Sequence, residues 1–472
     1  PVSASYRISY VYGMKMKPIW DIPSLQLTWI PARKRRWKPK KGGNYSMELT
    51  TMFIVMFAMF FIGVPIGVCL LLPIFLLIAM NGITTQEFIA SIMYTGVASY
   101  TMIALPFFIL AGNLMNAGGL SKRLVAIANS LIGRITGSLG MVAILACMFF
   151  GAVSGSAPAT VAAIGGIMLP EMVRHGYNKY YAVALITVAG SLGVIVPPSF
   201  PMVVYGVTMG VSIGDLFMAG LGPSLLVGLI LMLINYFYCK KHHIVGKRKF
   251  TVKELLFSMK DGWPALFMPV IILGGIYGGI FTVTEASVVA CVFGVVVGCF
   301  YYKELKLKEI FNQLKSTSTF VGGTLLTLAP AAALGQIFAY MGVTRSITRF
   351  FTNTVDSKVV VILLVFLILF IAGMFVQTTP MIVILGPILL NVLQPYGIDP
   401  IQFGIIMVLA LSIAFCTPPL ATNLFVSSSM TGIPMERIVK PMIPFVIGLA
   451  IVLFVVAFVP AVIYLPLRLF GG

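Results

Sequence analysis

Long apolar runs separated by short polar loops dominate this 472-residue chain. Five runs approach or exceed the length of a membrane span: 51–80, 101–116, 216–238, 359–376 and 443–463. A helix needs about 20 apolar residues to cross the hydrocarbon layer. The hydropathy pattern therefore predicts an all-α polytopic membrane protein, with the lipid bilayer as its surroundings. Further spans are expected near 88–116, 180–210, 214–239, 264–281, 284–302 and 320–342.

One apolar block, at about 137–172, carries the stretch GAVSGSAPAT in its middle. Basic clusters fall at 33–41, 122–134, 174–179, 240–260 and 303–315. All of them stay on the cytoplasmic side if this block enters the membrane and returns on the same side. We therefore expect a re-entrant helical hairpin, whose irregular tip is tolerated only where it lines a cavity or is buried in protein.

The two halves of the chain share a series of landmarks in the same order and at a near-constant spacing. SLGVIVPPSF, which starts at Ser191, aligns with SIAFCTPPLA, which starts at Ser412. The aligned pairs are Pro197-Pro198 with Pro418-Pro419, Gly176 with Gly397, Gly151 with Gly373, Pro158 with Pro380, and Gly112 with Gly335. The crossing order makes the two copies inverted, which is a common design of secondary transporters.

This repeat predicts the organisation of the chain. Residues 1–46 form a basic linker or the remnant of an upstream domain. Repeat 1 covers 47–245, with its hairpin at about 137–172 and a Pro-broken transmembrane helix at about 180–210. Repeat 2 covers 246–472, with a hairpin at about 357–394 and a broken helix at about 400–429.

Composition narrows the class of protein. The chain is 59% hydrophobic and 10% charged, and its net charge of +19 is carried at the ends of the apolar segments. This distribution favours membrane topology over nucleic-acid binding, so no nucleic-acid partner is expected. The six cysteines are scattered without a C-x-x-C pair, which disfavours a disulfide or metal framework.

A broken helix exposes carbonyl groups at one end and N–H groups at the next start. Carbonyls and hydroxyls suit Na⁺, and helix N-termini suit a carboxylate. The candidate residues at the two tips and two breaks are Ser154, Gly155, Ser156, Gly193, Val194, Ser199, Gln377, Thr378, Thr379, Thr417, Thr422 and Asn423. The competing interpretation is that these small residues only permit tight helix packing.

Acidic residues offer little alternative chemistry within the spans. Glu285 lies in Thr282-x-x-Glu285, a capping box, and Asp215 follows Gly214 at another expected helix start. Sodium coupling is therefore favoured over proton coupling. No catalytic constellation is present in the sequence, so the chain is expected to be a secondary active transporter and not an enzyme.

Four stretches together resemble the large membrane subunit (DctM type) of tripartite ATP-independent periplasmic (TRAP) transporters. They are GIFTVTEASVVA (279–290), GAVSGSAPATVAAIGGIMLPEM (151–172), GSLGVIVPPS (190–199) and TPPLATNLF (417–425). The resemblance covers about 48–470. It departs from the family at Val283, where proline is common, and at Gln377, where many members carry an acid.

The resemblance implies an elevator-type, Na⁺-coupled importer of organic acids, such as sialic acid or a C4-dicarboxylate, in the bacterial inner membrane. It also implies two protein partners, a small four-helix membrane subunit and a periplasmic substrate-binding protein. It adds Ala157, Val196 and Pro418 to the candidates. The expected Na⁺ ligands are Ser154, Gly155, Ser156, Gly193, Val196, Gln377, Thr378, Thr379, Thr417 and Pro418. The expected substrate contacts are Ser156, Ala157, Ser199, Thr379, Thr422 and Asn423.

Two alternatives remain open. The first is a stand-alone Na⁺/dicarboxylate symporter that works without a binding protein. The second is a channel or a membrane-embedded enzyme, although a channel needs no paired helix breaks and an enzyme should show catalytic groups at membrane depth.

Overall fold

The computed structural model describes residues 46–81, 85–132, 135–245, 251–419 and 421–470. Internal contacts divide the chain into two units, Pro1–Ser46 and Met47–Gly472, and the second unit is described below. Apart from Ser46, the predicted linker lies outside the described residues.

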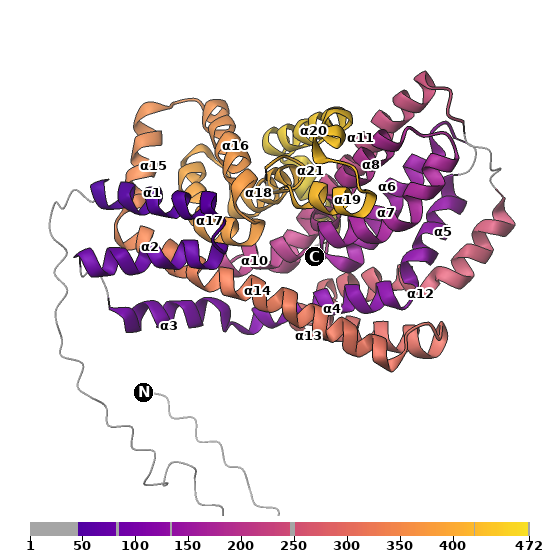
Figure 1. The fold of residues 1–472 in the computed structure, drawn as a ribbon, viewed down its shortest axis with the longest axis horizontal. Helices are drawn as coiled ribbons and strands as arrows, with labels where there is room; N and C mark the ends of the chain where they lie inside the picture. Colours follow the sequence, from indigo (N-terminus) through magenta and orange to yellow (C-terminus); the bar gives the residue numbers. More distant parts are fainter. Residues whose placement is uncertain (1–45, 82–84, 133–134, 246–250, 420, 471–472) are drawn as a thin grey trace, which may run out of the picture. The chain divides into compact units, whose positions relative to one another are not determined.

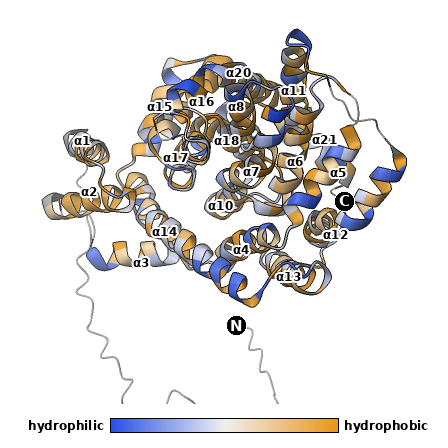
Figure 2. Ribbon diagram, turned by 45° about the vertical axis from the view of Figure 1, so that its right-hand side comes forward, coloured by the Kyte–Doolittle hydropathy of each residue, from blue (hydrophilic) through white to orange (hydrophobic). Residues whose placement is uncertain are grey.

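The described residues form helices joined by short loops, and their one β-bridge is the isolated pair Thr136 and Val245. Nine of these helical segments are long and apolar enough to cross a membrane. Hydrophobic residues cover most of the helices, and the most hydrophilic stretches lie at helix ends (Figure 2). The expected all-α multi-pass membrane protein is confirmed.

One group of helices forms a curved row along one side of the unit (Figures 1 and 2). The members of this outer row are α1 (Ser46–Ile62), α2 (Ile66–Asn81), α3 (Gln86–Val97), α4 (Ala104–Ala117), α12 (Val252–Tyr277), α13 (Val283–Val296) and α14 (Leu307–Tyr340). Within it, α4 packs on α13, and the long helix α14 packs on α2, α3 and α4. A π-turn, Val297–Tyr301, extends α13.

Most of the remaining helices pack together as a bundle beside the outer row. Its earlier members are the pair α6 (Ser138–Ser154) and α7 (Ala157–Arg174), the broken series α8 (Lys179–Ala189), α9 (Leu192–Ile195) and α10 (Phe200–Met209), and the long helix α11 (Ile213–Lys241). Its later members are the pair α16 (Lys358–Phe375) and α17 (Thr378–Leu393), the broken series α18 (Pro400–Ala414) and α19 (Thr422–Thr431), and the helices α20 (Met435–Phe458) and α21 (Ala461–Phe470). Helix α14 of the outer row packs on α17 of the bundle.

Two of the expected spans are interrupted. The span expected at 88–116 forms α3 and α4, joined through residues 98–99 and the short 3-10 turn Tyr100–Ile103. Residues 51–80 form two helices, α1 and α2, separated at Gly63, Val64 and Pro65. Pro65 has no N–H to donate to the preceding turn, and it disfavours the helical conformation for Val64, so both effects favour the end of α1 before it. The residues on both sides of this boundary are apolar, so the hydropathy pattern alone predicts one continuous span.

The matched sequence landmarks form the same local structure at two positions. Gly176 and Gly397 both adopt a positive φ in the turn that precedes a buried helix. The side chain of Asn178 then accepts hydrogen bonds from the first N–H groups of α8, and that of Asp399 does the same for α18. A side-chain oxygen at this position satisfies N–H groups that have no partner within the helix.

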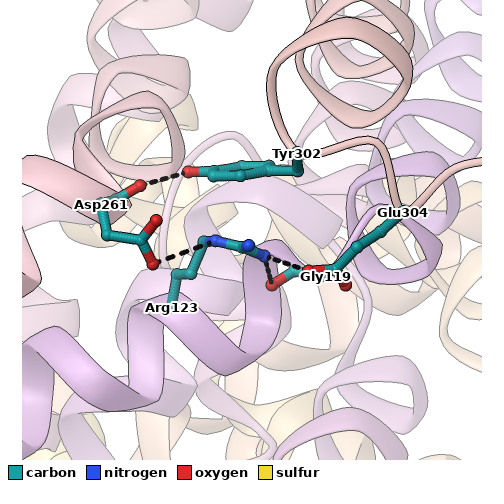
Figure 3. Close-up of polar contacts among 5 residues, drawn as sticks. All are labelled: Gly119, Arg123, Asp261, Tyr302 and Glu304. Atoms are coloured by element: carbon teal, nitrogen blue, oxygen red, sulfur yellow. Dashed lines mark hydrogen bonds and ion pairs between the residues drawn. The ribbon is translucent and has the colours of Figure 1, made fainter.

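A short amphipathic helix precedes each hairpin: α5 (Leu120–Ile132) before α6, and α15 (Val343–Thr354) before α16. Figure 3 shows how α5 is attached to the outer row. The Arg123 guanidinium forms ion pairs with Asp261 at 3.2 Å and Glu304 at 2.9 Å. It also donates to the Gly119 carbonyl and lies 3.5 Å from the centre of the Tyr302 ring.

Candidate functional site

The turn between α6 and α7 is only two residues long, Gly155 and Ser156. Gly155 has φ +58°, a conformation that glycine adopts without steric cost. The hydroxyl groups at this tip form hydrogen bonds within the tip itself. The hydroxyl of Thr160 donates to the Ser156 carbonyl at 2.8 Å and lies 3.2 Å from the hydroxyl of Ser154. This first tip is therefore internally hydrogen-bonded.

The first helix break packs directly against this tip. The chain is non-helical from Val196 to Ser199, and the Pro197-Pro198 peptide bond is cis. The hydroxyl of buried Ser199 donates to the Val194 carbonyl at 2.5 Å. A Cβ atom on Gly193 would lie 2.5 Å from the Ser156 carbonyl oxygen, so only glycine allows this approach of break and tip.

The second tip, between α16 and α17, has a different hydrogen-bonding state. Thr378 and Thr379 are buried and Gln377 is exposed, and none of their side chains hydrogen-bonds to a described residue. In the adjacent break, the Pro418-Pro419 bond is cis and the Thr417 hydroxyl donates to the Ile413 carbonyl at 3.0 Å. The buried hydroxyl of Thr422, at the start of α19, has no partner among the described residues.

The two breaks meet through buried polar side chains. The hydroxyl of Ser191 donates to the Ser412 carbonyl at 3.2 Å, so the first residues of the two matched sequences touch each other. The Asn423 amide donates to Ser191 at 3.3 Å and to the Thr187 carbonyl at 3.2 Å. Because these groups lie among apolar helices, the bonds hold the two broken helices in one relative position.

Both tips, and residues that flank both breaks, line one cavity of about 400 Å³. Four helices begin at its wall: α7, α10, α17 and α19. Every side chain in the described lining is uncharged. The lining comprises Ile66, Ile109, Gly155, Ser156, Ala157, Pro158, Val194, Phe200, Pro201, Thr319, Phe320, Gly323, Thr324, Thr327, Gln377, Thr378, Thr379, Phe415 and Thr422.

Some of the predicted residues line the cavity, and the others lie outside its lining. The predicted residues in the lining are Gly155, Ser156, Ala157, Val194, Gln377, Thr378, Thr379 and Thr422. Those outside it are Ser154, Gly193, Val196, Ser199, Thr417, Pro418 and Asn423. Of this second group, Ser154, Gly193, Ser199 and Asn423 support the tip and the breaks through the contacts given above. The assignment of ion and substrate ligands remains a prediction.

Sequence reasoning missed the contribution of α14. Thr319, Gly323 and Thr327 lie four residues apart on one face of this helix and line the cavity, together with Thr324. The signal was present as small and polar residues at helical spacing inside an apolar span. Thr160 was also missed, because only the fold brings its hydroxyl to the Ser154 hydroxyl.

A second, smaller cavity of about 60 Å³ adjoins the second tip and break. Gln377, Thr378 and Thr422 line both cavities. The hydroxyl of Thr422 is buried without a partner among the described residues, and it is the kind of oxygen that a bound cation or polar ligand would satisfy. The donor set at this position therefore fits Na⁺, whose ligands are oxygen atoms.

The two acidic residues that the sequence assigned to helix starts lie at helix starts. Thr282 and Glu285 form a complete capping box at the beginning of α13. Asp215 is in the first turn of α11, where the Ser212 hydroxyl accepts its N–H at 3.2 Å. Both predictions are confirmed.

The fold and the shared cavity define the class as a multi-pass helical membrane protein with paired helix interruptions around an uncharged cavity. A crystal structure of the Alcanivorax borkumensis YdaH transporter has a similar fold, with a TM-score of 0.56 and 15% identity. The match covers 80% of this chain and 88% of that one.

The family is established by sequence. Residues 53–462 match the model of the DctM component of tripartite ATP-independent periplasmic transporters, and the chain belongs to this family. The C4-dicarboxylate TRAP transporter large permease protein DctM of Pseudomonas aeruginosa is 39% identical, over 77% of this chain and 85% of the relative. The sialic acid TRAP transporter large permease protein SiaM of Vibrio cholerae is 35% identical, over 87% and 96%.

A third relative is longer than this chain. The isethionate TRAP transporter permease protein DctMQ of Oleidesulfovibrio alaskensis is 40% identical over 86% of this chain, and the match spans 64% of the relative's length. The resemblance recognised in the sequence motifs is thus confirmed at the level of the family.

Proposed function

We propose that this chain is the transport subunit of a Na⁺-coupled importer of an organic acid in the bacterial inner membrane. The convergence of four helix starts on one uncharged cavity carries the proposal. Each helix start places the positive end of a helix dipole at the wall. The N–H groups of Phe200 and Asn423 already donate to the Gly155 and Phe415 carbonyls, so the other first-turn N–H groups are the ones left for a ligand. An organic anion can therefore be held there without a basic side chain.

The size and chemistry of the cavity agree with such a substrate. About 400 Å³ lies within the range of small-molecule sites. The named relatives act on C4-dicarboxylates, sialic acid and isethionate, all of which are organic anions. Substrate contacts are assigned to Ser156, Ala157, Thr379 and Thr422, with Ser199 and Asn423 acting from behind the wall.

Two Na⁺ sites complete the proposal, one at each tip. The first uses Ser154, Gly155, Ser156, Gly193 and Val196, and the second uses Gln377, Thr378, Thr379, Thr417 and Pro418. The second is favoured near the small cavity, where the Thr422 hydroxyl lacks a partner among the described residues. Bound cations would balance the charge of the anion, since no charged side chain in the described lining does so.

The proposed movement is that of an elevator with two inverted repeats. The bundle that carries the tips and breaks moves against the outer row, with α5 and α15 as connecting arms. The ion pairs of Arg123 support a fixed position of α5 on the outer row. The tripartite family supports two partners, a small four-helix membrane subunit and a periplasmic binding protein.

The proposal is tested by reconstituting the chain with its small subunit in liposomes. Uptake of labelled isethionate, C4-dicarboxylates and sialic acid is measured with and without a Na⁺ gradient and a purified binding protein. We expect uptake only when both are present. Uptake that ignores the binding protein would favour the stand-alone symporter, and undiminished uptake without Na⁺ would contradict the ion assignment.

A further inference from the structure

A second large cavity, of about 610 Å³, lies away from the tips and breaks, where the starts of α8 and α20 meet the end of α11. Its lining combines Arg437 and Lys440 with three tyrosine rings, two prolines, Asn178 and one acid, Glu436. Neither Arg437 nor Lys440 forms an ion pair within the described part of the chain. Their positive charges are therefore available to a ligand.

The tyrosines give this cavity a rigid aromatic wall. The rings of Tyr181 and Tyr238 are stacked, with centroids 3.4 Å apart and planes 6° apart. The hydroxyl of Tyr180 lies 3.5 Å from an Arg437 nitrogen. Tyrosine is enriched where a membrane protein passes from hydrocarbon to water, because its ring is apolar and its hydroxyl is polar.

The charge around the cavity places it on the cytoplasmic side of the membrane. Lys179 starts α8 and is exposed, and Lys240 and Lys241 end α11 and are also exposed. Cytoplasmic loops of membrane proteins carry an excess of lysine and arginine. The inner leaflet is also where anionic lipid headgroups attract such basic groups.

An apolar stripe continues from the cavity along α20. Ile443, Ile447 and Ile451 follow Lys440 at helical spacing and are 50%, 54% and 49% exposed. Residues four apart lie on one face of a helix, so the three form a continuous strip. Because α20 is long and apolar enough to span the membrane, this strip faces lipid, and the acyl chain of a lipid whose headgroup lies at the cavity would cover it.

We propose that this cavity binds an anionic phospholipid, with the headgroup phosphate between Arg437 and Lys440 and an acyl chain along Ile443, Ile447 and Ile451. Charge complementarity selects the headgroup, and the apolar strip selects a lipid over free phosphate. The site is separate from the transport cavity, and its test does not depend on transport activity.

Native mass spectrometry of the detergent-purified full chain tests this site. Phosphatidylglycerol and phosphatidylethanolamine with identical acyl chains are titrated against the chain, Arg437→Gln/Lys440→Gln, and the control Arg345→Gln/Lys358→Gln. The control also removes one arginine and one lysine. We expect the unaltered chain and the control to retain phosphatidylglycerol preferentially, and the cavity variant to lose this binding roughly tenfold.

Glu436→Gln provides a test in the opposite direction, independent of whether the double variant folds well. Removing this negative charge should tighten phosphatidylglycerol binding. Equal binding of the two lipids, unchanged binding by the double variant, or no gain with Glu436→Gln would overturn the proposal. Displacement of the lipid by inorganic phosphate would also overturn it, since it would indicate a soluble-anion site.

Discussion

The tips of α6–α7 and α16–α17 line the same cavity, but their polar groups are in different states. At the first tip, the hydroxyls of Ser154 and Thr160 lie within hydrogen-bonding distance, and Thr160 bonds to the Ser156 carbonyl. At the second tip, the side chains of Gln377, Thr378 and Thr379 form no such bond with a described residue. The two tips therefore differ in how far their side-chain hydroxyls already have partners among the described residues.

The two amphipathic helices α5 and α15 also differ in their polar contacts. Arg123 ties α5 to the outer row through two ion pairs and a ring contact. On α15, Arg345 and Arg349 form no ion pair within the described residues. Helix α5 is therefore held to the outer row by charged contacts that α15 lacks within the described residues.

The largest effect is expected from Gly193→Ala. The added Cβ would overlap the Ser156 carbonyl and force the first tip away from its break, at a cost of about 3 kcal/mol. Transport and thermal stability should both fall. Gly166→Ala on α7 is the matched control, because a Cβ there meets no atom within 4 Å. Equal behaviour of the two variants would mean that the close packing of the first half is unimportant.

Arg123→Gln tests the attachment of α5. It leaves Asp261 and Glu304 without their cation, and we expect a loss of about 2 kcal/mol in stability, as for hydrogen bonds to charged groups. Arg349→Gln on α15 should be close to neutral. Thermal unfolding in detergent measures both, and a similar loss for the two variants would remove the difference between the arms.

Thr422→Val and Ser154→Ala compare the loss of a hydroxyl that has no partner among the described residues with the loss of one that is already hydrogen-bonded. We expect the concentration of Na⁺ or substrate needed for half-maximal uptake to rise about tenfold, which corresponds to about 1.4 kcal/mol. Stability should hold, because the hydroxyl has no partner to lose within the described chain. Ser154→Ala should instead lower stability by about 1 kcal/mol with a smaller change in uptake. The reverse pattern would contradict the larger share in ligand binding that we expect of the second tip and break.

The smallest effect is expected from Thr417→Val. This hydroxyl already donates to the Ile413 carbonyl, but its lone pairs can still accept a cation. We expect Na⁺ activation of uptake to weaken about threefold, which corresponds to about 0.7 kcal/mol. Unchanged Na⁺ activation would remove Thr417 from the ligands and leave it as a support of the break.

Much of the architecture follows from local sequence. Hydropathy predicts the membrane class, and the double prolines at Pro197 and Pro418 predict where helices cannot continue, because proline lacks an N–H. The capping box at Thr282 and Glu285 is also local, since it joins residues three apart. The separation of α1 from α2 was missed, because a proline between two apolar runs leaves the hydropathy unchanged.

The composition of the cavity was predicted only in part. Ser156 and Thr379 lie in its wall, as expected from the position of each at a helix start. Ser199 and Thr417 have the same sequence character, yet they turn to backbone carbonyls. A hydroxyl forms whichever hydrogen bond its surroundings offer, and motif position does not specify those surroundings.

The sequence by itself therefore determines that this chain spans a membrane, where the two Pro-Pro breaks fall, and which motifs occur twice along the chain. These properties depend on composition and on neighbours a few residues away. Only the tertiary structure decides that Ser191 meets Ser412, that Thr319 and Thr327 of α14 face the tips, and that Thr422 is left without a partner among the described residues. Those facts depend on helices distant in the chain packing together, and packing settles which polar groups are satisfied.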